Sequence, residues 1–179
     1  MPRKNKKLPR HLLVIRTSAM GDVAMLPHAL RALKEAYPEV KVTVATKSLF
    51  HPFFEGLDVG FLDIETRRTH RGIRGAIRFA REAAELKIDA VADMHNVLRS
   101  KMVRAALHLR GIPVSVIHKG RIEKYMRLGR GSEGVKPLKH TVIRYCDVFR
   151  RLGFDFPDPR PTEKRPRPNP MAVSYTHLT

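Results

Sequence analysis

The sequence has 179 residues, 42% of them hydrophobic, with a single cysteine, and its 35 Lys and Arg against 17 Asp and Glu give a formal charge of +18. This length predicts one compact domain, and the composition excludes a disulfide-stapled secreted domain and, because no run of about 18 apolar residues occurs, a membrane-spanning helix. The charge predicts an anionic partner, for which nucleic acid, an anionic membrane surface and a phosphorylated substrate are all open.

Residues 1–10 hold five basic side chains and are predicted to form a disordered basic arm. The apolar stretch after this arm stops at Arg16, too soon for a secretory signal, so we expect a cytoplasmic protein. From 11 to 153, short apolar runs alternate with helical periodicities. Strands are predicted at 12–15, 42–45, 61–64, 89–93 and 114–117, and helices at 23–36, 73–86, 97–109 and 141–152. This alternation predicts an α/β fold, with a Rossmann-like, doubly wound parallel sheet covered by helices on both faces.

The end of the chain changes in composition. Residues 118–139 are glycine-rich and predicted to form a loop, and Gly153 is a helix C-cap signal. Residues 154–170 hold six prolines and are predicted to be a linker to a second domain. Residues 171–179 resemble one translation frame of a sequencing adaptor and are predicted to be non-native, with a genuine short tail as the alternative. We therefore expect the natural chain to continue past Pro170.

The first strand-to-helix turn, from Arg16 to Asp22, is the first candidate site, because ligands of doubly wound sheets bind beyond the carboxyl ends of the strands. It lacks both G-x-G-x-x-G and G-x-x-x-x-G-K-[ST], which argues against a Rossmann oxidoreductase and a P-loop protein. Gly21 permits close backbone approach by a ligand. Two interpretations of Asp22 stay open: the N-cap of a helix that begins at Val23, or a general base.

Several blocks of the sequence together resemble glycosyltransferase family 9, the bacterial lipopolysaccharide heptosyltransferases. The most specific is LVIRTSAMGDV at 13–23, followed by Leu26-Pro27 and ALRAL at 29–33. The later blocks, in the family's order and spacing, are Arg67-Arg68, the D-x-x-x-D pattern from Asp89 to Asp93 with Arg99-Ser100, and His140-Thr141-Val142 with Arg144. The match spans 11–155. Met94-His95-Asn96 stands where many members have Leu-Gln-Gly, so we expect the acceptor to differ from that of the best-known members.

The resemblance implies a GT-B enzyme of two Rossmann-like domains, of which residues 11–153 form the N-terminal, acceptor-binding half. Such enzymes transfer a heptose from ADP-heptose with inversion and without a catalytic metal. It implies that Asp22 is the catalytic base that takes the proton from the acceptor hydroxyl. We assign acceptor binding to Thr17, Ser18, Met20, Gly21, Arg67, Arg68, Arg121 and His95. The nucleotide sugar would bind in the second domain, so this half alone is expected to be inactive.

The charges fit such an acceptor, because carboxylates and phosphates of an inner core are bound by arginine forks. Further arginines follow at 71, 74, 78 and 81 along one predicted helix face, although a solvated surface is the alternative for Arg74 and Arg81. With the basic arm, they are expected to hold the protein at the inner face of the inner membrane.

The histidines lack zinc-ligand spacing, so no metal is expected, and no cofactor is expected either. A surface role for His95 is equally open. For His140, the resemblance implies a place at a helix start, with either a structural role or a supporting role behind the residues that contact the acceptor. The main competing function is a basic nucleic-acid-binding module, against which stands an aromatic content of 7% without Trp.

Overall fold

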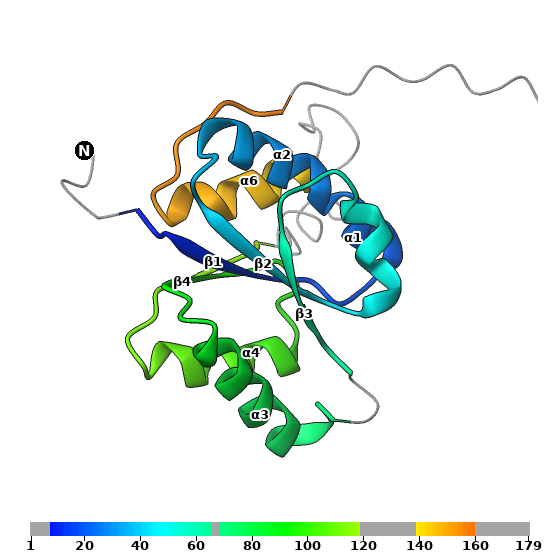
Figure 1. The fold of residues 1–179 in the computed structure, drawn as a ribbon, viewed down its shortest axis with the longest axis vertical. Coiled ribbons are helices and arrows are strands. Elements are labelled where there is room, and N and C mark those ends of the chain that lie inside the picture. Colours follow the sequence, from blue (N-terminus) through cyan, green and yellow to red (C-terminus); the bar gives the residue numbers. More distant parts are fainter. Residues whose placement is uncertain (1–7, 66–68, 119–138, 160–179) are drawn as a thin grey trace, which may run out of the picture.

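The computed structural model describes residues 8–65, 69–118 and 139–159, which form a parallel sheet between two layers of helices (Figure 1). The strands are β1 (His11–Ile15), β2 (Lys41–Thr46), β3 (Gly60–Asp63), β4 (Ala90–Asp93) and β5 (Val114–Val116), in the order β3-β2-β1-β4-β5. The chain therefore winds outward from β1 to β3, returns, and continues from β4 on the other side of β1. The predicted doubly wound Rossmann-like sheet is confirmed, and its strand order reverses between β1 and β4.

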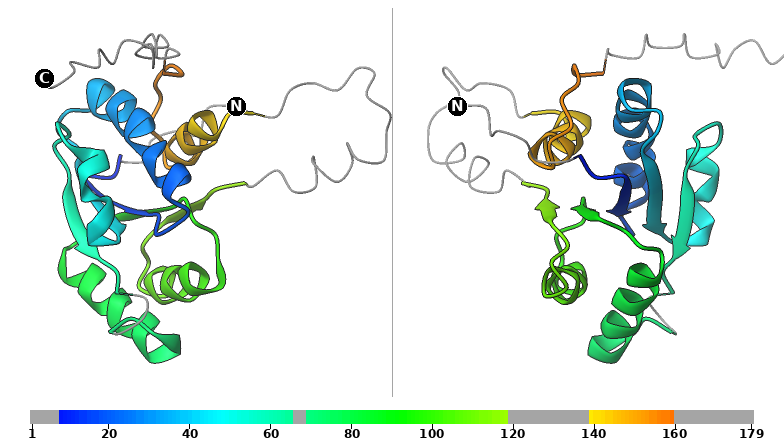
Figure 2. Two further views of the ribbon diagram at one scale, coloured as in Figure 1. Left: turned by 90° about the vertical axis from the view of Figure 1, so that its right-hand side faces the viewer. Right: turned by 60° about the vertical axis from the view of Figure 1, so that its left-hand side comes forward.

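Helices cover both faces of this sheet (Figures 1 and 2). On one face lie α1 (Met20–Ala24), α2 (Leu26–Ala36), the 3-10 helix η1 (Ser48–Phe54) and α6 (Thr141–Arg151). On the other lie α3 (Gly72–Glu85) and α4 (Leu98–His108). The hydrophobic run of β1 explains why both faces are covered: Leu12 and Val14 enter one core, whereas Leu13 and Ile15 enter the other.

The predicted strands agree with the observed ones to within one residue at each end, as do three of the four predicted helices. The fourth prediction, one helix over 23–36, is wrong, because two helices cover this region. The first, α1, starts earlier, and Met25 separates its end from the start of α2. Pro27 lies in the first turn of α2, where its missing N–H costs no helical hydrogen bond. A further element that no sequence pattern predicted is η1, which brings Phe50 and Phe54 into the core.

The chain stays packed against the domain after α6 ends. Gly153 has φ +108°, and its N–H donates to Arg150 while that of Phe154 donates to Phe149, the paired bonds of a glycine C-cap. Phe154 and Phe156 then pack into the core beside α2 and α6. The first residues of the predicted linker, 154–159, are therefore part of the packed domain.

None of the described helices has the length and apolarity that a membrane span requires. The predicted basic arm apart from residues 8–10, the centre of the glycine-rich loop, the remainder of the linker and the tail lie outside the described residues.

Candidate functional site

Two loops meet where the strand order reverses. The loop from Arg16 to Ala19 follows β1, and the loop from Met94 to Val97 follows β4, the strand beside β1. Ser18 Oγ lies 3.4 Å from His95 Nε2. The predicted residues Thr17, Ser18, Met20, Gly21, Asp22 and His95 all lie on these two loops or on the adjoining helix α1. Arg67, Arg68 and Arg121 lie outside the described residues, so their assignment stays a prediction.

Asp22 is the third residue of α1, and its side chain is 44% exposed. The helix begins at Met20 with Ala19 as its N-cap, so the interpretation of Asp22 as an N-cap is wrong. One carboxylate oxygen accepts a hydrogen bond from Arg16, and the Asp22 main-chain carbonyl accepts one of 2.9 Å from the Tyr145 hydroxyl. Asp22 is thus held from the loop after β1 and from α6, while its carboxylate still reaches solvent.

Arg16 is the buried partner in this arrangement, with a side chain only 7% exposed. Its guanidinium donates to the Asp22 carboxylate and to the main-chain carbonyl of Met94, and lies 5.9 Å from the centre of the Tyr145 ring. Burial of a charge is costly without such partners, so Arg16 ties the β1 and β4 loops together. No role was predicted for Arg16 from the sequence, where its one distinguishing feature is a basic residue directly after an apolar strand.

Tyr145 comes from α6, which packs over the same end of the sheet. Burial raises the pKa of its phenol to about 12, so the hydroxyl keeps its proton and remains a hydrogen-bond donor to Asp22. The site is therefore assembled from both ends of the described chain.

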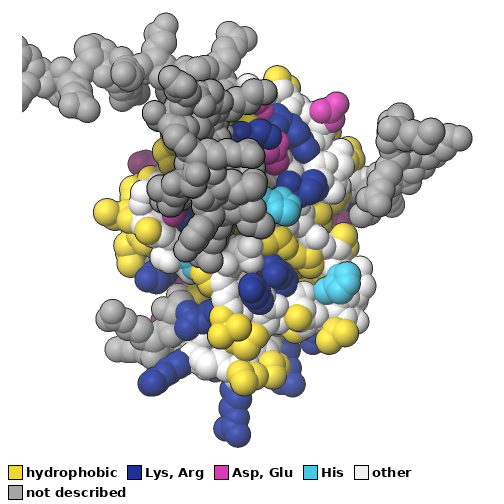
Figure 3. Space-filling model, turned by 180° about the vertical axis from the view of Figure 1, so that it is seen from behind, with side chains coloured by type: hydrophobic (Ala, Val, Ile, Leu, Met, Phe, Trp, Pro, Cys, Tyr) yellow, Lys and Arg dark blue, Asp and Glu magenta, His cyan; other side chains and the backbone are white. Residues whose placement is uncertain are grey.

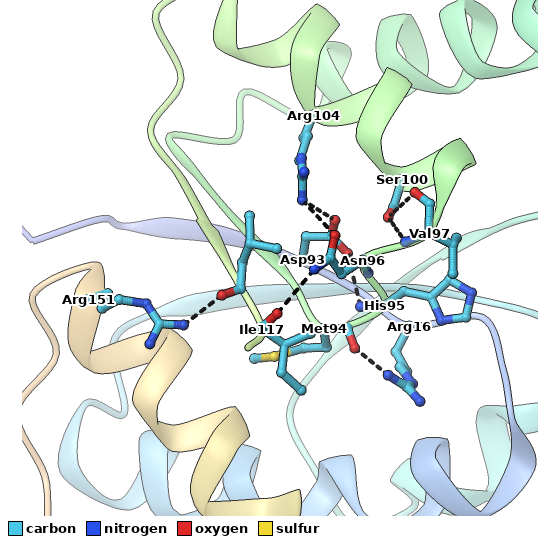
Figure 4. A network of polar contacts seen from close by, with 11 residues as sticks. Arg16, Asp93, Met94, His95, Asn96, Val97, Ser100, Arg104, Ile117 and Arg151 are labelled. Atoms are coloured by element: carbon cyan, nitrogen blue, oxygen red, sulfur yellow. Dashed lines mark hydrogen bonds and ion pairs between the residues drawn. The ribbon is translucent and has the colours of Figure 1, made fainter. Parts of the chain in front are cut away.

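The two aspartates of the D-x-x-x-D pattern hold backbone. Asp89 accepts hydrogen bonds from the N–H groups of Arg10 and His11, at 2.8 and 3.0 Å, and so anchors the start of β1. Asp93 is fully buried; one of its oxygens accepts the N–H groups of His95 and Asn96, and the other accepts from Arg104 at 3.1 Å (Figure 4). These contacts assign both carboxylates a structural role.

Asn96 occupies the third position of the segment that departs from the Leu-Gln-Gly pattern. It stands at the glycine position and has φ +46°, a left-handed conformation that asparagine adopts more readily than most other residues. Its side chain donates to the main-chain carbonyl of Ile117 at 3.3 Å. The loop after β4 therefore takes a left-handed turn at a residue that carries a side chain, where the family pattern has glycine.

A cavity of about 300 Å³ adjoins the site on the α3 and α4 side of the sheet. Its walls are mainly apolar, and its lining residues are Ile15, Thr17, Ile64, His70, Gly75, Ala76, Phe79, His95, Val97, Leu98, Arg99, Ser100 and Val103. Thr17 and His95 connect it to the loops of the candidate site. Nothing in the sequence pointed to this cavity, because its walls come from four separate segments.

His70 forms part of the cavity wall just after the segment that carries Arg67 and Arg68. Its Nδ1 accepts the N–H of Glu65 at 3.1 Å, and its Nε2 lies 3.0 Å from a carboxylate oxygen of Glu82. The main-chain N–H of His70 also donates to the main-chain carbonyl of Glu65 at 3.0 Å, so hydrogen bonds join the residues on either side of this segment.

His140 is the N-cap of α6, where its Nδ1 accepts the N–H of Val142 at 3.4 Å. Its predicted position at a helix start is confirmed, and the capping bond favours the structural role. Within the described ranges, no three His, Cys, Asp or Glu side chains gather as metal ligands.

No protein-family model and no curated protein matches this sequence. Solved structures do match. A glycosyl transferase family 9 structure from Veillonella parvula DSM 2008 has a TM-score of 0.59 at 17% identity, over 80% of this chain and 42% of that one. The E. coli heptosyltransferase WaaC with ADP has a TM-score of 0.55 at 22% identity, over 82% and 49%. The E. coli ADP-heptose lps heptosyltransferase II has a TM-score of 0.53 at 19% identity, over 88% of this chain and 44% of that one.

The present chain thus spans about half the length of these proteins. At such low identity the likeness is one of fold, and it agrees with the resemblance drawn from the sequence blocks.

Proposed function

We propose that this chain is the acceptor-binding half of an inverting glycosyltransferase of the family 9 type. It would serve the transfer of a heptose or related sugar from a nucleotide sugar to a lipopolysaccharide inner-core-type acceptor. The observation that carries the proposal is Asp22, a half-exposed carboxylate fixed by Arg16 where the strand order reverses. The fold that surrounds it is similar to that of two E. coli heptosyltransferases.

In the proposed reaction, the Asp22 carboxylate accepts the proton of an acceptor hydroxyl while that oxygen attacks the anomeric carbon of the donor. The new C–O bond forms on one face of the sugar, and the bond to the nucleoside diphosphate breaks on the other, with the electron pair leaving on the phosphate oxygen. General-base assistance of this kind contributes roughly 10²- to 10⁴-fold in rate. Arg16 would keep the carboxylate in place, because a guanidinium holds a carboxylate in a defined orientation.

Acceptor contacts are proposed for Thr17, Ser18, Met20, Gly21 and His95, together with Arg67, Arg68 and Arg121. The donor would bind to a second domain, and a bound ADP in the solved WaaC structure is consistent with a nucleotide-sugar donor. Without that domain, the 179-residue chain would bind acceptor weakly and transfer nothing. A lipid-linked acceptor would bring the protein to the cytoplasmic face of the inner membrane.

The decisive test is Asp22→Asn in a gene product that joins this domain to its donor domain. We expect kcat to fall by roughly 10²- to 10⁴-fold while KM for the acceptor changes little, because asparagine keeps the shape but cannot accept the proton. Asp58→Asn is the matched control, since Asp58 is an exposed carboxylate that pairs with Lys34 away from the site. An Asp22→Asn enzyme with the kcat of the control would exclude Asp22 as the base.

Two measurements on the 179-residue chain address the alternatives. Turnover of a nucleotide sugar by this chain alone would contradict its assignment as an acceptor half. In a salt titration, steep and sequence-independent binding to random DNA, tighter than binding to an inner-core oligosaccharide, would favour a nucleic-acid-binding module instead.

A further inference from the structure

The outward side of α3 combines exposed isoleucines with arginines. Ile73 is 68% exposed and Ile77 is 45% exposed, one helical turn apart. At about 100° per residue, Arg74 and Arg81 follow within roughly 100° of Ile73 around the helix, and both are exposed. We call these four residues, Ile73, Arg74, Ile77 and Arg81, the α3 outer face. The opposite side of the helix buries Ala76, Phe79, Ala80 and Ala83 in the core.

The arginines of this face make no ion pair within the described residues, although the exposed Glu85 follows Arg81 by about one helical turn. Arg78, at the border of the face, pairs with Glu82 at 2.9 Å. Arg74 and Arg81, and Arg71 at the N-cap of α3, have no ion pair with any described acidic residue. The α3 outer face is therefore both positively charged and apolar.

The surroundings extend this character. Leu98, at the start of α4, is 74% exposed and lines the cavity together with Ala76 of α3. Seen from behind, hydrophobic side chains gather between Lys and Arg side chains over the end of the molecule where α3 and α4 lie (Figure 3).

We propose that the α3 outer face binds the surface of an anionic lipid bilayer, with Ile73 and Ile77 at the boundary of the acyl chains and Arg74 and Arg81 on lipid phosphates. A helix with a basic side and adjoining apolar residues is suited to such an interface. Each arginine near an anionic surface strengthens binding by about fivefold. The inference depends on exposure and charge, and holds whether or not the protein transfers a sugar.

Other occupants fit this face less well. A second copy of the chain would bring its own unpaired arginines against these, and like charges repel. Nucleic acid would neutralise the arginines but would leave the isoleucines without apolar contact, and the described face has no aromatic side chain on which a base could stack. A lipid surface satisfies both kinds of side chain at once.

A tryptophan reporter tests insertion, because the native chain contains no Trp. The probes are vesicles of phosphatidylcholine alone and of phosphatidylcholine mixed with phosphatidylglycerol. We expect the fluorescence of Ile73→Trp to shift to shorter wavelength on the anionic vesicles only. Leu49→Trp is the matched control, because Leu49 is 63% exposed on η1, in the opposite layer of helices. The proposal would be overturned if the anionic vesicles caused no shift in Ile73→Trp, or if they caused equal shifts in Ile73→Trp and Leu49→Trp.

Vesicle sedimentation then separates the apolar from the charged contribution. Ile73→Ser with Ile77→Ser leaves the charge unchanged and is expected to weaken binding about fivefold or more. Arg74→Gln with Arg81→Gln is expected to weaken it about 25-fold. The control, Arg31→Gln with Lys41→Gln, removes the same charge from exposed positions elsewhere and is expected to have a much smaller effect.

If the two double variants that each remove two positive charges lost vesicle binding equally, overall charge and not this face would bind the bilayer, and the proposal would be overturned. A dimer in solution that the two serine substitutions dissociate would also overturn it. Circular dichroism verifies that each variant is folded. The vesicles contain neither glycan nor nucleotide, so a negative result here leaves the proposed transferase function untouched.

Discussion

At the scale of single residues, the arrangement of Arg16 and Asp22 determines what the site can do. Arg16 is buried and needs a counter-charge, whereas Asp22 is half-exposed and could reach a substrate. The carboxylate is therefore fixed by a group that is itself fixed by the Met94 carbonyl and the Tyr145 ring. A base held in this way loses little freedom when an acceptor binds, which is the physical basis of the proposed role.

A substitution at Gly21 distinguishes whether the glycine is required for folding or for acceptor binding. It lies inside α1 without a positive φ, and an added Cβ would meet no atom within 4 Å. Gly21→Ala should therefore leave the melting temperature unchanged or raise it, since alanine favours a helix over glycine by up to about 1 kcal/mol. If the acceptor approaches the backbone here, its affinity in calorimetry should fall. Unchanged affinity would remove Gly21 from the acceptor site.

His11 makes the stability of the domain depend on pH. It is buried at the start of β1, with Nε2 2.8 Å from Thr43 Oγ1, and burial, followed by the charge of Lys41, lowers its pKa below 6.5. The unfolded chain then binds the proton more readily than the folded one. The stabilisation from neutral His11 is fully present above about pH 6.5 and is lost as the pH falls below that value towards the folded-state pKa.

Urea unfolding of the native chain and of His11→Gln, between about pH 7.5 and about pH 5, measures this effect. We expect the free energy of unfolding of the native chain to fall more steeply towards low pH than that of the variant. Because the two proteins differ only at position 11, the difference between the curves isolates His11. Parallel curves would show that its pKa is the same in the two states.

At the scale of elements, α3 starts in close contact with the segment before it. A Cβ on Gly75 would lie 2.2 Å from the main-chain carbonyl carbon of His70, whose ring is held by Glu65 and Glu82. The main chain of His70 and the helix backbone at Gly75 cannot move apart easily, so Gly75→Ala should lower the free energy of unfolding by about 1–3 kcal/mol or more. Gly21→Ala, a helical glycine with open space, is the control in the same denaturant titration. Equal stability of the two variants would contradict this packing.

Periodicity explains why most elements could be predicted. Buried strands are short apolar runs, and α3 and α6 each have one buried side, so both patterns are visible in the sequence. The break between α1 and α2 was not visible, because the apolar residues on either side of Met25 fit a single helical period. The 3-10 helix η1 was missed because a seven-residue segment containing Pro52 has neither period.

At the scale of the whole molecule, the boundary of the domain follows its core and not its composition. Phe154 is fully buried and Phe156 is 5% exposed, although both lie in the proline-containing segment that looked like a linker. The Tyr37 hydroxyl also donates to the carbonyl of Asp155 at 2.9 Å. The segment 154–159 thus continues the packing of α6 against α2.

Two truncations measure this boundary. A chain that ends at 159 should have the melting temperature of the 179-residue protein, whereas a chain that ends at 153 loses both phenylalanines. Burial of a phenylalanine contributes about 1.5–3 kcal/mol, so the shorter chain should be less stable by roughly 3 kcal/mol or more. Equal melting temperatures for the two truncations would return the boundary to 153.

The sequence by itself determined the class of the fold and predicted the place of the candidate site. Strand and helix periodicity is a local property, and ligands bind beyond the carboxyl ends of parallel strands, so the sequence is enough to place the candidate site in the turn that ends at Asp22. The resemblance to family 9 came from the same residues, and the solved structures agree with it at the level of the fold.

Only the tertiary structure decided which groups surround that site. Arg16 and Tyr145 are 129 residues apart, and the cavity joins β1, α3 and α4, so no window of the sequence contains either arrangement. The structure also assigned Asp89 and Asp93 to backbone support, and separated the exposed isoleucines of α3 from its buried side. The physical reason is that partners, burial and exposure depend on how distant segments pack, whereas periodicity depends only on neighbours along the chain.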